Sequence, residues 1–206
     1  MKYVNFDNSK SGVEQFDASI EWSMLFGAAT PAAWVALQAQ RYMQRYGVSN
    51  RDLGEVSVIL RRHASTNPNA WFYQKPITIE EHQASRWIID PVFRLFDCCQ
   101  ESDGGVALVV TRTDRARDLK QTPVRILHAT QSVPFGTETV TDFYRDDLTR
   151  MHSGEEAARE LYTRTGVGPD DIQVAMLYDH FTIAVYWHLE AFGFCGPGEA
   201  RAGAHR

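Results

Sequence analysis

The side chains best suited to chemistry lie in the run Tyr178-Asp179-His180. A tyrosine hydroxyl can donate a proton and an aspartate can accept one, so Tyr178 and Asp179 could perform general acid–base catalysis. The run separates two apolar stretches, 172–177 and 181–192, which predicts a turn that joins a strand to a helix. Such a turn holds polar side chains firmly beside the positive end of the helix dipole. The alternative is that Asp179 only caps the helix and Tyr178 only packs.

Basic residues form two groups that could contact the phosphates of a nucleotide-like ligand. Arg61 and Arg62 lie near the end of a predicted helix, where positive charge also favours the helix dipole. The second group is spread over residues 112–125. For both groups, the alternative is a solvated helix face that binds no ligand.

The three cysteines, Cys98, Cys99 and Cys195, are poor candidates for a metal site or a nucleophile. They lack the pair spacing of a zinc site, and neighbouring cysteines rarely form a disulfide. No glycine-rich turn or helix start surrounds Cys98 and Cys99, so buried structural thiols are expected there. The histidines show no metal-binding spacing, and His188 is expected to pack within an aromatic stretch. We therefore predict no metal site and a reduced, cytoplasmic protein.

Composition excludes several classes of protein. The 206 residues are 44% hydrophobic and 23% charged, which is typical of a folded domain rather than a disordered tail. The formal charge of −5 argues against nucleic acid as the main partner, because phosphate neutralisation needs clustered lysine and arginine. No apolar run approaches the ~20 residues that span a bilayer, and the first residues lack the apolar region of a signal peptide.

Capping signals predict where several helices begin. Each start pairs a serine or threonine with an acidic residue three positions later, or with a proline in the first turn. A glycine just after a helix favours its end. We expect helix starts at Thr30-Pro31, at Ser49 with Asp52, at Thr78 with Glu81 and at Ser153 with Glu156, and helix ends at Gly47 and Gly166.

Three unbroken apolar segments, 106–110, 124–129 and 172–177, are predicted to be buried strands. Because strands alternate with helices, a parallel or mixed sheet is expected. Ligands of such sheets bind at the C-terminal ends of strands, where Tyr178 lies. The Gly- and Ala-rich residues 196–206 are expected not to fold.

Taken in order, several segments resemble the thiolase superfamily, specifically its lipid-transfer-protein branch, akin to the sterol-carrier-protein thiolases. The resemblance covers about residues 25–200 and is specific as an ordered set rather than through any one segment. It rests on Pro31-Ala32-Ala33-Trp34 through Gln40-Arg41-Tyr42-Met43, Arg61-Arg62-His63-Ala64 through Asn67-Pro68-Asn69-Ala70, Ser85-Arg86, Asp90-Pro91, Leu95-Phe96-Asp97-Cys98-Cys99, Ser102-Asp103-Gly104-Gly105, Gly166-Val167-Gly168 through Asp170-Asp171-Ile172, Leu177-Tyr178-Asp179-His180-Phe181 and Gly193-Phe194-Cys195-Gly196.

The resemblance implies an α/β fold of thiolase-like αβαβα layers, present here in part, with a mostly helical loop-domain region. It assigns residues 1–103 to the loop-domain-like region, 104–121 to the last strand and helix of the first thiolase half, and 122–206 to the start of the second, C-terminal half. The family's nucleophilic-cysteine segment and its later Asn/Gly-Gly, Gly-His and Cys-x-Gly motifs are not found in this sequence. The chain is therefore expected to be an internal portion, and Cys195-Gly196 is not given the role of the last motif.

The resemblance also implies roles for site residues. True thiolases carry Asn-Glu-Ala-Phe or His-Asp-Cys-Phe at this position, where the first residue helps to form an oxyanion hole. The Tyr-Asp-His-Phe form is similar to that of thiolase-like aldolases that cleave steroid side chains as coenzyme A thioesters. By that likeness Tyr178 acts in proton transfer or enolate stabilisation, and Asp179 orients it or binds substrate. The candidate contacts to substrate or coenzyme A are His180, Arg61 and Arg62.

The partners implied by the resemblance are an acyl-CoA substrate, a second copy in a homodimer, and a small zinc-ribbon and OB-fold protein. No tightly bound cofactor is implied.

Three functions stay open from the sequence. The first is retro-aldol cleavage of a bulky or steroid-type acyl-CoA, which needs a base and an enolate site but no acyl-cysteine. The second is a Claisen-type acetyl-CoA acetyltransferase, which needs a nucleophilic cysteine in a context that none of the three cysteines has. The third is a catalytically incomplete subunit or fragment, because a partial sheet leaves a bare edge and an uncovered apolar face. The family favours an enzyme, whereas this chain alone is not expected to catalyse independently.

Overall fold

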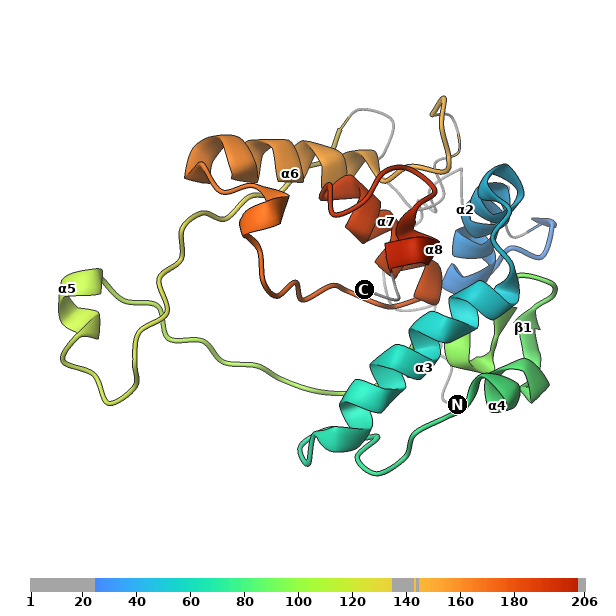
Figure 1. Cartoon of the computed structure of the whole chain (residues 1–206), viewed down its shortest axis with the longest axis horizontal. Coiled ribbons are helices and arrows are strands. Elements are labelled where there is room, and N and C mark those ends of the chain that lie inside the picture. The colour runs from blue at the N-terminus through green and yellow to red at the C-terminus, as the bar shows by residue number, and fades with distance from the viewer. Residues whose placement is uncertain (1–24, 135–142, 144, 204–206) are drawn as a thin grey trace, which may run out of the picture.

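The computed structural model describes residues 25–134, 143 and 145–203. Within them the chain is mainly helical and carries a small antiparallel hairpin (Figure 1). No helix in this part of the chain has the length and apolarity needed to cross a membrane. In chain order the elements are α2 (Pro31–Tyr46), α3 (Asn50–Thr66), α4 (Ile79–Ala84), β1 (Trp87–Ile89), β2 (Phe93–Arg94), the 3-10 helix η1 (Leu95–Asp97), α5 (Thr113–Ala116), α6 (His152–Thr165), the 3-10 helix η2 (Pro169–Asp171), α7 (Thr182–Ala191) and α8 (Ala200–Gly203).

Local capping explains where α2, α3 and α4 begin. The Thr30 side chain accepts a hydrogen bond from the third backbone amide after it, at the start of α2. Complete capping boxes open the next two helices, Ser49 with Asp52 at α3 and Thr78 with Glu81 at α4. The glycine after α2 adopts φ 66°, a left-handed conformation that glycine tolerates without a steric penalty. These predicted boundaries are confirmed.

The predicted capping box of Ser153 and Glu156 is wrong. α6 begins one residue before Ser153, and its N-cap has no side-chain hydrogen bond. Arg150 instead donates two hydrogen bonds to the Glu155 carboxylate, Nε to Oε1 at 2.7 Å and Nη2 to Oε2 at 2.8 Å. This bidentate pair ties the preceding turn to the first helical turn, where a negative charge also complements the dipole. The predicted end of α6 at Gly166 is confirmed.

The hydrophobic core joins segments that lie about 100 residues apart in the sequence. Leu53 of α3, Phe93 of β2 and Ile183 of α7 are fully buried in one cluster. The Phe93 and Phe181 rings stack with their centroids 5.2 Å apart. α7 is therefore held by residues of the first half of the chain as well as by its sequence neighbours α6 and α8.

The predicted buried strands at 106–110, 124–129 and 172–177 are not strands in this structure. They run as extended chain, and α5 stands apart from the other helices between the first two of them (Figure 1). An apolar run favours a strand only where a neighbouring strand takes its backbone hydrogen bonds, and none of the described residues does so here. The most exposed large apolar side chains in the three segments are Val106 (91%), Val124 (92%) and Met176 (93%).

The prediction that residues 196–206 do not fold is wrong for the part that the structure describes. α8 forms there, and its first residue, Ala200, is fully buried in the core. The Gly198 amide donates to the Glu190 carboxylate of α7 at 2.9 Å. Burial of Ala200 and the bond to Glu190 stabilise a segment whose sequence gives little indication of a helix. Residues 204–206 lie outside the described residues.

Candidate functional site

Residues 178–180 form the loop that enters α7, and Phe181 is the N-cap of that helix. The predicted helix after the Tyr-Asp-His run is thereby confirmed. The 178–180 loop pairs with the chain that leaves η1. The Cys99 amide donates to the His180 carbonyl (N···O 2.9 Å), and Cys98 forms an antiparallel bridge with Phe181. The loop therefore has backbone support from a segment more than 80 positions earlier.

Tyr178 and Asp179 both face solvent. The Tyr178 side chain is 71% exposed, and its ring stacks on that of His180 with centroids 4.9 Å apart and planes 17° from parallel. Asp179 is also exposed, and no side chain caps α7 through its N-cap residue. The alternative in which Asp179 caps the helix and Tyr178 is packed in the core is therefore wrong. Both groups are accessible to a ligand.

His180 is half-buried beside these residues. Burial, followed by the nearby His188, lowers the pKa of His180 below its ordinary value of 6.5. Its Nδ1 atom is buried and has no hydrogen-bond partner among the described residues. Burial therefore favours the neutral form of the ring.

A groove of about 500 Å³ runs between α6, α7 and the extended segment that ends at Tyr178. Its lining is mostly apolar, with Leu161, Ile172 and Phe192 among the contributors, whereas Tyr178 and His188 add polar groups. The apolar lining of this groove suits a bulky apolar ligand. The groove places the exposed phenol at the edge of a cavity.

His188 was expected to pack within an aromatic stretch, and the structure agrees: it is half-buried and bonded to the backbone of α7, while it also contributes to the groove lining. Its Nδ1 lies 2.7 Å from the Ala184 carbonyl, so Nδ1 carries a proton and donates it there. In the neutral ring Nε2 then remains a proton acceptor.

Arg61 and Arg62 do not line the groove. The Arg61 guanidinium lies 3.6 Å from the centre of the Phe72 ring and donates to the Lys75 carbonyl at 3.4 Å. Burial lowers its pKa. Arg62 is exposed on the surface of α3. The structure thus brings Tyr178, Asp179 and His180 together and keeps these two arginines out of the groove beside them.

The three thiols are in their protonated form at neutral pH. Burial raises the pKa of Cys98 to about 12 and that of Cys195 to about 11. It raises the pKa of Cys99 as well. Thiolate, not thiol, is the nucleophile, so these positions are unsuited to acyl-enzyme chemistry. Within the described residues, no three metal-ligating side chains gather in one place.

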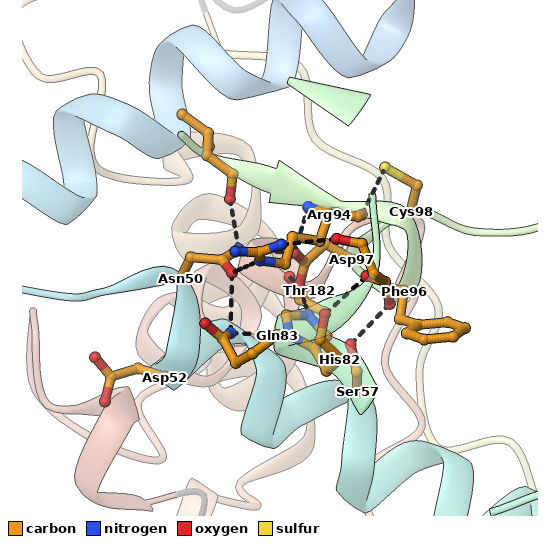
Figure 2. A network of polar contacts seen from close by, with 12 residues as sticks. Asn50, Asp52, Ser57, His82, Gln83, Arg94, Phe96, Asp97, Cys98 and Thr182 are labelled. Atoms are coloured by element: carbon orange, nitrogen blue, oxygen red, sulfur yellow. Dashed lines mark hydrogen bonds and ion pairs between the residues drawn. The ribbon is translucent and has the colours of Figure 1, made fainter. Parts of the chain in front are cut away.

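A buried polar network connects α3, α4, β2 and α7 (Figure 2). At its centre the Asp97 carboxylate is fully buried and accepts four hydrogen bonds. The donors are His82 Nε2 (2.9 Å) and Thr182 Oγ1 (3.0 Å) to Oδ1, and Asn50 Nδ2 (2.9 Å) and the Arg94 amide (2.8 Å) to Oδ2. Sequence reasoning missed Asp97, because its side-chain partners lie 15, 47 and 85 positions away.

Comparison with known proteins identifies the fold. Residues 136–205 match the family model described as thiolase C-terminal domain-like. A solved structure, the Ltp2-ChsH2(DUF35) aldolase, matches this chain with a TM-score of 0.89 and 48% sequence identity. This chain is thiolase-like. The match covers 96% of the thiolase-like chain and 52% of the solved one, and the predicted resemblance and fold class are confirmed.

Curated relatives of this thiolase-like chain include two enzymes. The steroid side-chain-cleaving aldolase of Thermomonospora curvata is 50% identical over 184 residues, which cover 89% of this chain and 47% of the relative. The 17-hydroxy-3-oxo-4-pregnene-20-carboxyl-CoA lyase of Mycobacterium tuberculosis is 52% identical over 175 residues, 85% of this chain and 45% of the relative. Bovine sterol carrier protein 2 is 29% identical over 165 residues. The chain spans about half the length of the first two of these relatives.

Proposed function

We propose that this chain contributes Tyr178 and Asp179 to the retro-aldol cleavage of a bulky, steroid-type 3-hydroxyacyl-CoA. The observation that carries the proposal is the exposed Tyr178 phenol at the entrance to α7, where it lines an apolar groove. Two relatives support the same reaction class by their names: one is an aldolase that cleaves steroid side chains, and the other is a carboxyl-CoA lyase.

The reaction balances without an oxidant or a metal. A base removes the proton of the β-hydroxyl group, the carbinol carbon becomes a carbonyl, and the bond between Cα and Cβ breaks. The electron pair of that bond becomes the enolate of the thioester, which is then protonated at Cα. Tyr178 can transfer the proton or donate a hydrogen bond to the enolate oxygen. Asp179 orients Tyr178 or binds substrate, and His180 contacts substrate.

The Claisen-type alternative has weaker support. It requires an ionised cysteine, and the pKa of each of the three thiols is raised by burial. Retro-aldol chemistry requires no acyl-cysteine, so the raised pKa values do not affect it. Arg61 and Arg62 remain candidate phosphate contacts, outside the groove.

We extend the proposal to partners and domains. The solved relative carries a two-part name, Ltp2-ChsH2(DUF35) aldolase, which supports a second protein component. The zinc-ribbon and OB-fold character of that component, and a homodimer, are proposed from the family resemblance alone. The division into residues 1–103, 104–121 and 122–206 is supported by α5, which stands apart between two extended segments (Figure 1). The contact of α7 with α3 would then join the first region to the last.

The test is steady-state cleavage of a steroid 3-hydroxyacyl-CoA by the protein together with its small partner, with ketone release measured by chromatography. Tyr178→Phe removes only the hydroxyl and should lower kcat by roughly 10²- to 10⁴-fold. The matched control is Tyr73→Phe, at a second exposed tyrosine that lies outside the groove, and it should leave kcat unchanged. Full activity of Tyr178→Phe would remove Tyr178 from the mechanism.

A further inference from the structure

α7 lacks the side-chain cap that most helices use. Its N-cap is Phe181, whose side chain has no oxygen to accept a hydrogen bond from the first free backbone amides. Thr182, the first residue of the helix, instead directs its hydroxyl to Asp97 (Oγ1···Oδ1 3.0 Å) (Figure 2). The Asp97 carboxylate therefore supplies negative charge at the positive end of α7 from another part of the chain.

We propose that Asp97, acting through Thr182, is the positioning residue that fixes the 178–180 loop for catalysis. Two bonds from residues two positions apart, Asp97 and Cys99, act on the same short stretch. The Asp97 side chain holds Thr182, and the Cys99 amide holds the His180 carbonyl at 2.9 Å. Because Asp97 ends η1 and Cys99 lies two residues after it, the 178–180 loop and the first turn of α7 can move only if segment 97–99 moves or these bonds break. The catalytic consequence rests on the proposed function, whereas the mechanical coupling does not.

The Asp97 carboxylate is itself held by several hydrogen bonds. Its four donors come from α3, α4, β2 and α7, so both oxygens are satisfied and neither can rotate without leaving a buried donor unpaired. The Asn50 amide is equally constrained, because Nδ2 donates to Asp97 and to the Val92 carbonyl while Oδ1 accepts from Gln83 and Arg94. The bonds of Asn50 therefore restrict its amide, and that amide in turn restricts the Asp97 carboxylate.

The network also selects one form of His82. Gln83 Nε2 lies 3.0 Å from His82 Nδ1 and donates to it, and Asp97 Oδ1 accepts from His82 Nε2. The neutral ring with its proton on Nε2 satisfies both contacts. The Arg94 guanidinium, held by Asn50 and the Ser85 carbonyl at 2.7 Å, provides the nearby positive charge that accompanies the buried carboxylate.

The decisive experiment removes one hydroxyl. Thr182→Val keeps the side-chain shape and deletes the donor to Asp97, whereas Thr182→Ser keeps the donor. The matched control is Thr163→Val, which removes a hydroxyl bonded to a carbonyl of its own helix, α6. Native-state hydrogen exchange of the Cys99 amide reports directly on the pairing of the segment after η1 with the 178–180 loop. Amides of α6 report on global stability.

We expect Thr182→Val to speed exchange of the Cys99 amide at least tenfold relative to α6 amides, and Thr182→Ser to restore it. With a turnover assay, kcat should fall in Thr182→Val while KM stays near its original value. If the Cys99 amide exchanges at its original relative rate in Thr182→Val, the positioning inference is overturned, whatever the activity. If the parent protein cleaves no 3-hydroxyacyl-CoA, the proposed function fails, and the exchange result still decides the positioning inference.

Discussion

Tyr178 illustrates how a residue becomes available for chemistry. Its ring rests on His180 and is otherwise 71% exposed, so its hydroxyl is not committed to packing. Asp179 beside it is exposed as well. Exposed polar groups on a loop that a rigid scaffold holds are the usual arrangement at catalytic sites. The neighbouring buried residues therefore decide how accurately these two side chains are placed.

At the residue scale, the depressed pKa of His180 predicts a pH dependence. Burial disfavours the imidazolium, so the folded state binds fewer protons than the unfolded state once the pH falls below the ordinary pKa of 6.5. The contribution of His180 to the free energy of unfolding should change little well above pH 6.5, and it should lower that free energy as the pH falls through the window between 6.5 and the folded-state pKa. Urea denaturation at several pH values measures this slope.

His180→Gln should reduce the slope, because the substituted side chain does not titrate. The control His63→Gln, at an exposed histidine of α3, should leave it unchanged. A ring titration of His180 by NMR with a midpoint at or above 6.5 would contradict the prediction.

At the element scale, the packing of α4 on α3 depends on Gly54. A Cβ at this position would lie 2.6 Å from His82 Nδ1 and 2.7 Å from Ile79 Cδ1. Helix propensity alone favours alanine over glycine by about 1 kcal/mol. The steric clash would lower stability instead, and His82 cannot shift freely because it is hydrogen-bonded to Asp97.

We therefore expect Gly54→Ala to destabilise the protein by roughly 1–3 kcal/mol, as overpacking of a core does. The same substitution at Gly104, which has nothing within 4 Å of an added Cβ, is the control and should change stability little. Denaturant midpoints measure both variants. Stabilisation by Gly54→Ala would mean that helix propensity outweighs the packing of α4.

At the scale of the whole molecule, three extended segments leave large apolar side chains in contact with solvent. Val109 and Met176, for example, are 90% and 93% exposed. Exposed apolar chain with free backbone donors and acceptors is prone to pair with another chain. This feature favours the hypothesis that the chain functions as part of a larger assembly.

Light scattering on the purified chain, alone and with coenzyme A, is the corresponding measurement. We expect association beyond the 23.4 kDa monomer. The substitution Val109→Lys should reduce association, because a charge on an exposed extended segment opposes edge pairing. A monomer that unfolds in one sharp transition would contradict the prediction. A defined dimer that binds coenzyme A would instead support a fold competent for acyl-CoA chemistry.

The sequence by itself determined features that depend on neighbours within about four positions. The caps at Thr30, Ser49 and Thr78 are bonds between residues three apart, so each was visible in the sequence. The start of α7 was predicted from another local signal, the polar run Tyr178-Asp179-His180 before an apolar stretch. The ordered motifs also identified the thiolase-like fold, which the comparisons confirm.

Only the tertiary structure decided features whose partners lie far away in the chain. The apolar segments 106–110, 124–129 and 172–177 have the composition of strands, but a strand also needs a neighbour to pair with. The Asp97–Thr182 bond joins residues 85 positions apart and carried no local signal. Composition also gave no sign that Ala200 would be buried, because long-range packing decided its place.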